Sequence, residues 1–281
     1  MTKKPTAGTV GDSRGGARVG FLGYGRMAQA ISQGLDRSGL VPYAGQAAYD
    51  ILTEKLEGLA GERGFKPAGS VGGLVGSAPL IIVAVKPHQV NRLLREAAAA
   101  ATDQLFVSIA AGVTLSDLAE PLPKTVGLVR VIPNIPALVG QGMTLICAPE
   151  GGPPENLRRA REIFEAVGSV AVLDESLFNE GTAVSGSGPA YFFLFMEAMI
   201  RGAARLGLTW DLARELVLKT ALGSAQTALA NPGLSLADLR DQVASPGGTT
   251  AEGLLAMEEG ALTAVVLHAL QAASDKGRDL T

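Results

Sequence analysis

The feature that most constrains the fold of this chain is the alternation of short apolar runs with helical stretches between residues 17 and 173. The run 80–85, Leu-Ile-Ile-Val-Ala-Val, is continuously apolar, as expected for a strand buried on both faces of a sheet. We expect strands at 18–22, 46–50, 80–85, 105–109, 126–131, 143–147 and 170–173, and helices at 27–38, 53–60, 88–101 and 154–167. This order predicts an α/β fold, in which a doubly wound, mostly parallel sheet is covered by helices on both faces.

The strand pattern stops near Asp174, and the rest of the chain favours helices alone. We expect helices at 189–206, from Thr209 toward Asn231, from Ser235, at 249–259 and at 261–276. Ser235 and Asp238 have the spacing of a capping box. The chain is therefore predicted to have three parts: a flexible arm at 1–16, a sheet domain at 17–173 and an all-α domain at 174–281.

The expected helix at 189–206 is apolar nearly all round, and Tyr191-Phe-Phe-Leu-Phe-Met196 is its most aromatic segment. A helix of this kind should be buried on all sides, but the C-terminal part has little interior of its own to cover it. We therefore hypothesise that a partner subunit covers the helix, and that the all-α domain is an obligate dimer interface.

Composition argues against several classes of protein. The net charge of −3 is too small for counterion release on a nucleic acid duplex, so we expect no nucleic acid partner. A single cysteine, Cys147, rules out an internal disulfide framework and fits the cytoplasm. Together with His88 and His268 it is too little for a zinc-type cluster, so we expect no metal. The longest charge-free run, 131–149, contains prolines and glycines and is a poor membrane span.

A dinucleotide fingerprint follows the first expected strand and opens the first expected helix: Gly23-Tyr-Gly25-Arg-Met-Ala28. The first glycine permits a tight turn, the second lets the backbone approach a pyrophosphate, and Ala28 lets helix and strand pack closely. The helix N-terminus then offers N–H groups and partial positive charge to the phosphates. An ordinary strand–helix turn is the alternative, and the position between a strand and a helix argues against it.

Three strand ends carry polar residues that could face the same ligand. A carboxylate at Asp50 normally accepts hydrogen bonds from the adenosine ribose and would repel a 2′-phosphate, so we expect NADH to be preferred or both dinucleotides to be accepted. Lys86 follows the third expected strand, where it is either near the ligand or solvent-facing. Asn134 offers an amide to a ligand or to its own loop.

Two further glycine clusters lie in the second half of the chain. Residues 184–191 lead into the apolar helix and are best interpreted as a tightly packed helix N-terminus. Residues 244–250, Ala-Ser-Pro-Gly-Gly-Thr-Thr, place two glycines and three hydroxyls at a helix start, a pattern suited to binding a small carboxylate.

With these motifs in view, the sequence resembles the pyrroline-5-carboxylate reductase family from about Arg18 to Leu280. The resemblance rests on 20–28, 84–87, 130–136, 185–191 and 241–250. It implies an N-terminal Rossmann domain, a C-terminal helical domain interlocked in a homodimer or a ring of dimers, and hydride transfer from NAD(P)H to the cyclic imine pyrroline-5-carboxylate, giving L-proline.

The resemblance also implies roles for individual residues. Thr250 matches the threonine whose hydroxyl faces the imine nitrogen, and is the expected catalytic residue. The expected substrate-carboxylate residues are Ser245, Gly247, Gly248 and Thr249. The expected cofactor-binding residues are Gly23, Gly25, Arg26, Met27, Ala28, Asp50, Ala84, Val85, Lys86, Pro87 and Asn134. Asp50-Ile51 departs from the Asn-Arg-like pair of many relatives, which puts NADPH preference in doubt.

Some alternatives stay open from the residues alone. A cyclic imine is basic enough to need no strong side-chain acid, and His88 is either a proton donor or a surface residue at a helix start. The chain could reduce another cyclic imine or act on a small acid; the surroundings of Lys219 are unlike the catalytic lysine pattern of hydroxy-acid enzymes. It could also be a non-catalytic NAD(H)-sensing dimer. The glycine-rich stretch 69–76 has no assigned role.

Overall fold

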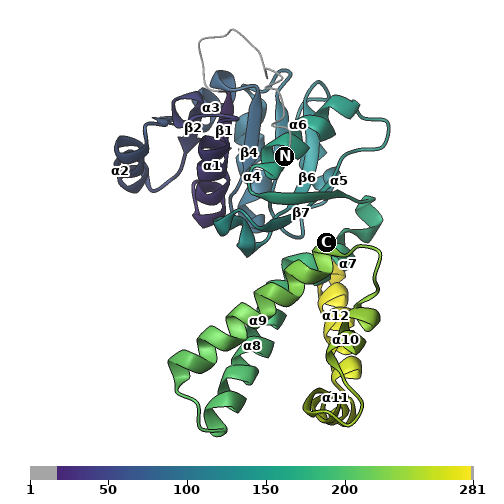
Figure 1. The fold of residues 1–281 in the computed structure, drawn as a ribbon. Helices are drawn as coiled ribbons and strands as arrows, with labels where there is room; N and C mark the ends of the chain where they lie inside the picture. Colours follow the sequence, from purple (N-terminus) through teal and green to yellow (C-terminus); the bar gives the residue numbers. More distant parts are fainter. Residues whose placement is uncertain (1–17, 280–281) are drawn as a thin grey trace. The chain divides into compact units, whose positions relative to one another are not determined.

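The computed structural model describes residues 18–279, which form two compact units (Figure 1). Among the described residues, the sheet unit comprises 18–186 together with 274–279, and the helical unit is Ser187–Ala273. The sheet unit therefore continues past the predicted domain boundary at residue 173. The predicted arm at 1–16 lies outside the described residues.

A single sheet of eight strands, in the order β3-β2-β1-β4-β5-β6-β7-β8, forms the sheet unit. Every neighbouring pair is parallel except β6 and β7, which are antiparallel. The strands are β1 (Val19–Leu22), β2 (Gln46–Tyr49), β3 (Lys66–Pro67), β4 (Leu80–Val83), β5 (Leu105–Ser108), β6 (Gly127–Ile132), β7 (Gly142–Cys147) and β8 (Gly168–Val172). The first six follow the strand order of a doubly wound dinucleotide-binding fold, which confirms the predicted fold class.

Helices cover both faces of this sheet (Figure 1). One core packs the sheet against α1 (Arg26–Ser38), α2 (Thr53–Arg63) and α6 (Pro154–Glu165). The other packs it against α3 (Val71–Ser77), α4 (Pro87–Ala98), α5 (Leu115–Ala119) and α7 (Phe178–Gly181). The short turns are η1 (Tyr43–Gly45), η2 (Ile135–Val139), η3 (Glu175–Leu177) and the π-helical η4 (Thr182–Gly186).

Most of the glycine-rich stretch 69–76, which has no role assigned from the sequence, lies in α3. Ser70 caps α3 by accepting a hydrogen bond from the Gly73 N–H at 3.0 Å, and Val71, Leu74 and Val75 bury its inner face. Glycine destabilises helices intrinsically, so this short helix depends on its cap and on packing, which propensity does not reveal. The five-residue helix α5 was also missed.

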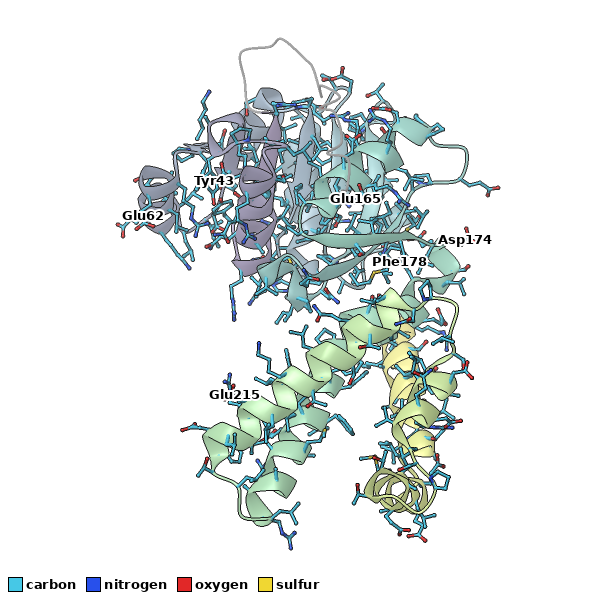
Figure 2. All side chains as sticks on the ribbon, in the orientation of Figure 1. Tyr43, Glu62, Glu165, Asp174, Phe178 and Glu215 are labelled. Carbon is cyan, nitrogen blue, oxygen red and sulfur yellow. The ribbon has the colours of Figure 1, made fainter. Side chains whose placement is uncertain are left out.

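Residues beyond the predicted boundary are anchored to the sheet. Phe178, labelled in Figure 2, is fully buried in the second core. The guanidinium of Arg130 lies 4.8 Å from the centre of its ring and forms an ion pair of 2.8 Å with Glu175. Cys147 lies opposite Arg130 on β7, and burial raises the pKa of its thiol to about 12. The segment 175–186 is thus part of the sheet unit because it fills and pairs with that unit's core.

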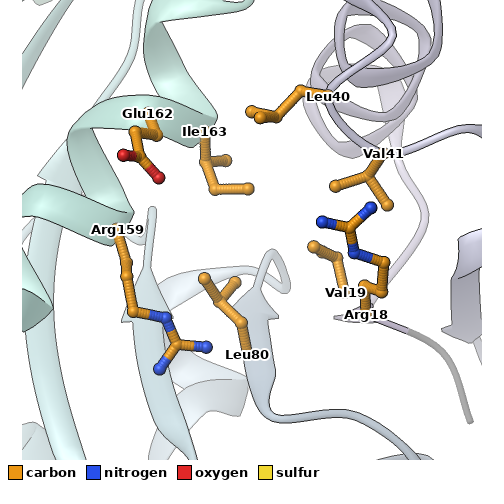
Figure 3. A pocket seen from close by; sticks show the side chains of 8 residues that line it. All are labelled: Arg18, Val19, Leu40, Val41, Leu80, Arg159, Glu162 and Ile163. Carbon is orange, nitrogen blue, oxygen red and sulfur yellow. The ribbon is translucent and has the colours of Figure 1, made fainter. Parts of the chain in front are cut away.

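A small pocket lies at the amino ends of β1 and β4, opposite the strand ends that carry the fingerprint (Figure 3). Its lining is mostly aliphatic, with charged side chains from the loop before β1 and from α6: Arg18, Val19, Leu40, Val41, Leu80, Arg159, Glu162 and Ile163. Because of its position it takes no part in the site described below.

The helical unit contains α8 (Gly188–Arg205), α9 (Trp210–Ala230), α10 (Leu236–Val243), α11 (Thr249–Glu259) and the first part of α12 (Leu262–Asp279). The predicted cap at Thr209 and the capping box at Ser235 are both confirmed by hydrogen bonds, to the N–H groups of Leu212 and Asp238. The end of α12 belongs to the sheet unit, where Ser274 and Arg278 bind the carboxylate of Glu180.

Burial in the helical unit is slight. Its buried apolar cluster consists of Ile200, Ala213 and Val217. Phe192 and Leu194 on α8, each 69% exposed, are left uncovered by this single chain. Among residues 18–279, no single helix is long and apolar enough to cross a membrane, although the bent pair α11 and α12 meets that test jointly.

Candidate active site

The fingerprint turn joins β1 to α1 at the carboxyl edge of the sheet. Gly23 has φ of +88°, and a Cβ there would lie 2.9 Å from the Ala84 carbonyl oxygen, so this position requires glycine. Gly25 is the N-cap of α1 with no side-chain cap, and a Cβ on it would meet nothing within 4 Å. The turn is therefore an open cradle beneath the uncapped N-terminus of a 13-residue helix, which fits the pyrophosphate of a dinucleotide.

Tyr24, between the two glycines, is held through its backbone, its ring and its hydroxyl. Its N–H donates to Asp50 Oδ2 at 2.7 Å, and its carbonyl accepts from Gln29 Nε2 at 3.0 Å. Its ring packs edge-on against Phe21 and tilted against Phe65, with centroids 5.7 and 4.6 Å away. These contacts fix the turn before any ligand binds.

The Tyr24 hydroxyl joins a buried polar network beneath the turn. It lies 2.7 Å from Ser32 Oγ, which donates to Gln46 Oε1 at 2.6 Å. Gln46 Nε2 in turn donates to the carbonyls of Ser32 and Val41. Burial raises the pKa of Tyr24, so the phenol stays protonated. The network ties the turn to both α1 and β2, and sequence analysis missed it because its members are far apart in the chain.

Asp50 follows β2 directly and uses both carboxylate oxygens within the protein. Oδ2 accepts the Tyr24 N–H, and Oδ1 accepts the Leu52 N–H at 3.0 Å. The carboxylate thus links the fingerprint turn to the loop before α2. A carboxylate has about four acceptor sites, so it can still accept from a ribose hydroxyl.

The end of β4 lies beside the fingerprint. Leu22 of β1 pairs in register with Tyr49 of β2 and Val83 of β4, so the residues that follow these strands are neighbours. Ala84 and Val85 are half-buried against Gly23, whereas Lys86, Pro87 and His88 are exposed at the start of α4. The structure therefore gathers the predicted cofactor residues of three strand ends: Gly23, Gly25, Arg26, Met27, Ala28, Asp50, Ala84, Val85, Lys86 and Pro87.

Asn134, after β6, is buried and its amide is engaged within the sheet unit. Its Oδ1 accepts the Met143 N–H at 2.9 Å, and its Nδ2 donates to the Ser185 carbonyl at 3.0 Å. The sequence left two roles open for Asn134, which were binding a ligand and holding its own loop. The geometry favours the second role, because the amide joins β7 and η4 to the end of β6.

The loop 245–250 in the helical unit is built around a tight turn. Gly247 has φ of +69°, and the Gly248 N–H donates to the Ser245 carbonyl at 3.0 Å. Gly248 is the N-cap of α11 with no side-chain cap, and Thr249 and Thr250 begin the helix. Within residues 18–279 the hydroxyls of Ser245 and Thr250 make no hydrogen bond, which leaves them available to a ligand. Backbone N–H groups and hydroxyls in this arrangement suit a carboxylate.

Comparison with known proteins supports both halves of this description. Residues 18–112 match the family model "NADP oxidoreductase coenzyme F420-dependent", and residues 175–280 match "Pyrroline-5-carboxylate reductase dimerisation". The fold and the paired domains define an NAD(P)H-dependent oxidoreductase that oligomerises through its helical domain.

Relatives narrow this class to one family. A pyrroline-5-carboxylate reductase of Methanosarcina acetivorans is 36% identical, over 94% of this chain and 97% of that protein. One from Pseudomonas aeruginosa is 38% identical, over 94% of this chain and 96% of that protein. The crystal structure of a Coxiella burnetii pyrroline-5-carboxylate reductase is 34% identical, covers 94% of this chain and 98% of that one, and has a TM-score of 0.88. The chain belongs to the pyrroline-5-carboxylate reductase family.

Proposed function

We propose that this protein reduces pyrroline-5-carboxylate to L-proline with NAD(P)H, the final step of proline biosynthesis. The observation that carries the proposal is the similarity to reductases of this name over nearly the whole chain, at 34–38% identity. The open fingerprint cradle and the hydroxyl-lined loop 245–250 support it independently. We assign dinucleotide binding to the sheet unit and substrate binding and dimerisation to the helical unit, the roles that the sequence predicts for 17–173 and 174–281.

The chemistry divides between the cofactor and the chain. The reduced nicotinamide supplies the hydride when bound. The N–H groups at Gly25–Ala28 bind the pyrophosphate, and Lys86 and Pro87 border the cofactor. Ser245 and the backbone of 247–249 hold the substrate carboxylate, which orients the ring. The C=N carbon gains the hydride, and the ring nitrogen carries the proton of the iminium.

Thr250 is the residue that we place at the ring nitrogen. Its hydroxyl forms a hydrogen bond with that nitrogen and favours the protonated, more electrophilic imine. The positive charge disappears as the ring is reduced, so this contribution is smaller than that of an oxyanion-hole donor. Holding the two reactants in contact accounts for more of the rate.

The test is Thr250→Ala. We expect turnover to fall about tenfold, which is less than for the loss of an oxyanion-hole donor, with the dissociation constant of NADH unchanged. Thr249→Ala is the matched control, because it keeps the backbone N–H that binds the carboxylate. Equal turnover in wild type and Thr250→Ala would remove this residue from the mechanism.

A substrate panel tests the reaction itself. Oxidation of the reduced cofactor is followed with pyrroline-5-carboxylate, with its six-membered homologue and with neither. Faster oxidation with pyrroline-5-carboxylate supports the proposal. Preference for the homologue indicates another cyclic imine reductase, and binding without oxidation indicates an NAD(H)-sensing dimer.

We further propose that NADH is at least accepted, since Asp50 lines the adenosine side of the site. For assembly we propose an obligate dimer through the helical domain, or a ring of such dimers. The cytoplasm is the proposed compartment, since the chain has one cysteine and therefore no internal disulfide framework.

A further inference from the structure

We propose that Lys55, in the first turn of α2, binds the 2′-phosphate of NADPH and thereby sets the dinucleotide selectivity of this chain. The inference rests on the proposed function only in that a dinucleotide occupies the fingerprint. It adds a selectivity-determining residue that the motif leaves out, because Lys55 lies outside the fingerprint and five residues beyond Asp50.

The first observation is a pocket next to the fingerprint turn. It is bordered by the turn, the end of β2 and the inner side of α2, and its lining residues are Tyr24, Gly25, Asp50, Leu52, Lys55, Leu56 and Leu59. In a fold of this kind the adenosine ribose lies beside the end of the second strand. The pocket is therefore where a 2′-hydroxyl or a 2′-phosphate would be recognised.

The second observation is the charge around this pocket. Among its lining residues, all within the described part of the chain, only Asp50 and Lys55 are charged. A 2′-phosphate beside Asp50 alone would be repelled. An ammonium facing the same pocket offsets this repulsion and can donate to a phosphate oxygen.

The third observation is that Asp50 and Lys55 differ in the contacts that they make within the protein. Both Asp50 oxygens accept backbone N–H groups, so this side chain is held at the turn. Lys55 is exposed and forms no ion pair within residues 18–279. Its side chain can therefore reach a ligand without first breaking a contact in the protein.

Two other cations are close in the fold but do not line this pocket. Arg63 donates to Gln29 Oε1 at 3.3 Å, which directs it toward α1. Arg26 is exposed at the first position of α1, on the pyrophosphate side. Arg26 should therefore respond to both dinucleotides alike, because they share the pyrophosphate.

The experiment measures binding rather than turnover. Dissociation constants of NADPH and NADH are determined by fluorescence titration of the full-length protein for wild type, Lys55→Gln, Arg26→Gln and Lys66→Gln. Lys66 is the matched control, since it is an exposed lysine that lines a different pocket. Each titration is run at low and high ionic strength.

For Lys55→Gln we expect NADPH to bind about three- to tenfold more weakly, as for loss of an exposed charge pair, with NADH binding changed less than twofold. The salt dependence of NADPH binding should weaken in this variant and persist in Lys66→Gln. Equal loss for both dinucleotides, no loss for either, or a loss selective for NADPH in Arg26→Gln instead, would overturn the proposal.

The outcome is separable from that of the proposed function. Selective loss of NADPH binding in Lys55→Gln supports the role of Lys55 even if pyrroline-5-carboxylate is not reduced. Conversely, a wild-type protein that reduces this substrate with unaltered NADPH binding in Lys55→Gln keeps its proposed function and loses this inference.

Discussion

The two units differ in how completely each covers its own apolar residues. In the sheet unit Phe21, Phe164 and Phe178 are fully buried, and two cores enclose the sheet from both faces. In the helical unit Phe192 is 69% exposed and the buried cluster is limited to three residues. An exposed apolar surface of this kind is typical of an interaction site.

This difference explains why the family's helical part is an oligomerisation domain. The helices of one chain cover both faces of the sheet, but they leave large apolar side chains of α8 and α9 exposed. We therefore expect a second chain, rather than the fold of one chain, to provide the burial that the apolar character of α8 predicts.

Phe192→Asp should have the largest effect, since it places a charge on the face that a partner covers. We expect dissociation to monomers and loss of activity, because burying an unpaired charge is very costly. Light scattering across a dilution series measures the mass. Ile51→Asp is the matched control: it is 73% exposed, lies in the sheet unit and should keep the wild-type mass. A wild-type mass for Phe192→Asp would show that no partner chain covers this face of α8.

Phe164→Ala tests the self-sufficient core of the sheet unit. Phe164 is fully buried on α6, and its truncation leaves a cavity that costs about 3–5 kcal/mol of unfolding free energy. Because this core lies within one chain, the cost should not depend on protein concentration. Denaturant unfolding at two concentrations measures it, with Phe164→Leu as the milder control. A concentration-dependent cost would show that the sheet unit also relies on its partner.

Tyr24→Phe should have the smallest effect, since it removes one buried hydrogen bond and keeps the ring. We expect a loss of about 1 kcal/mol in unfolding free energy and weaker binding of both dinucleotides. Tyr43→Phe is the control, because within residues 18–279 its hydroxyl forms no hydrogen bond. Equal unfolding free energies for the two variants would show that the Ser32 contact does not stabilise the turn.

Much of the fold could be predicted because it follows local rules. The continuous apolar run at β4 predicts a strand buried on both faces, and the capping residues Thr209 and Ser235 mark helix starts. The helix α3 could not be predicted, because its glycines oppose helix formation and its stability comes from burial of Val71, Leu74 and Val75.

For the site, the sequence by itself determined where the backbone must turn. Gly23 has to be glycine because its conformation and the Ala84 carbonyl exclude a side chain, and this requirement is visible as a motif. The hydroxyl-rich loop 244–250 is visible in the same way. Such features depend only on residues that are adjacent in the chain.

Only the tertiary structure decided what the polar side chains bind. It directs the Asp50 carboxylate to Tyr24 and Leu52, and the Asn134 amide to Met143 and Ser185. It also places Lys55 at the pocket beside the fingerprint turn. These partners are brought together by strand register and helix packing. A hydrogen bond requires its donor and acceptor to be placed to within a few tenths of an ångström, on residues that can be about fifty positions apart, and no local pattern encodes that placement.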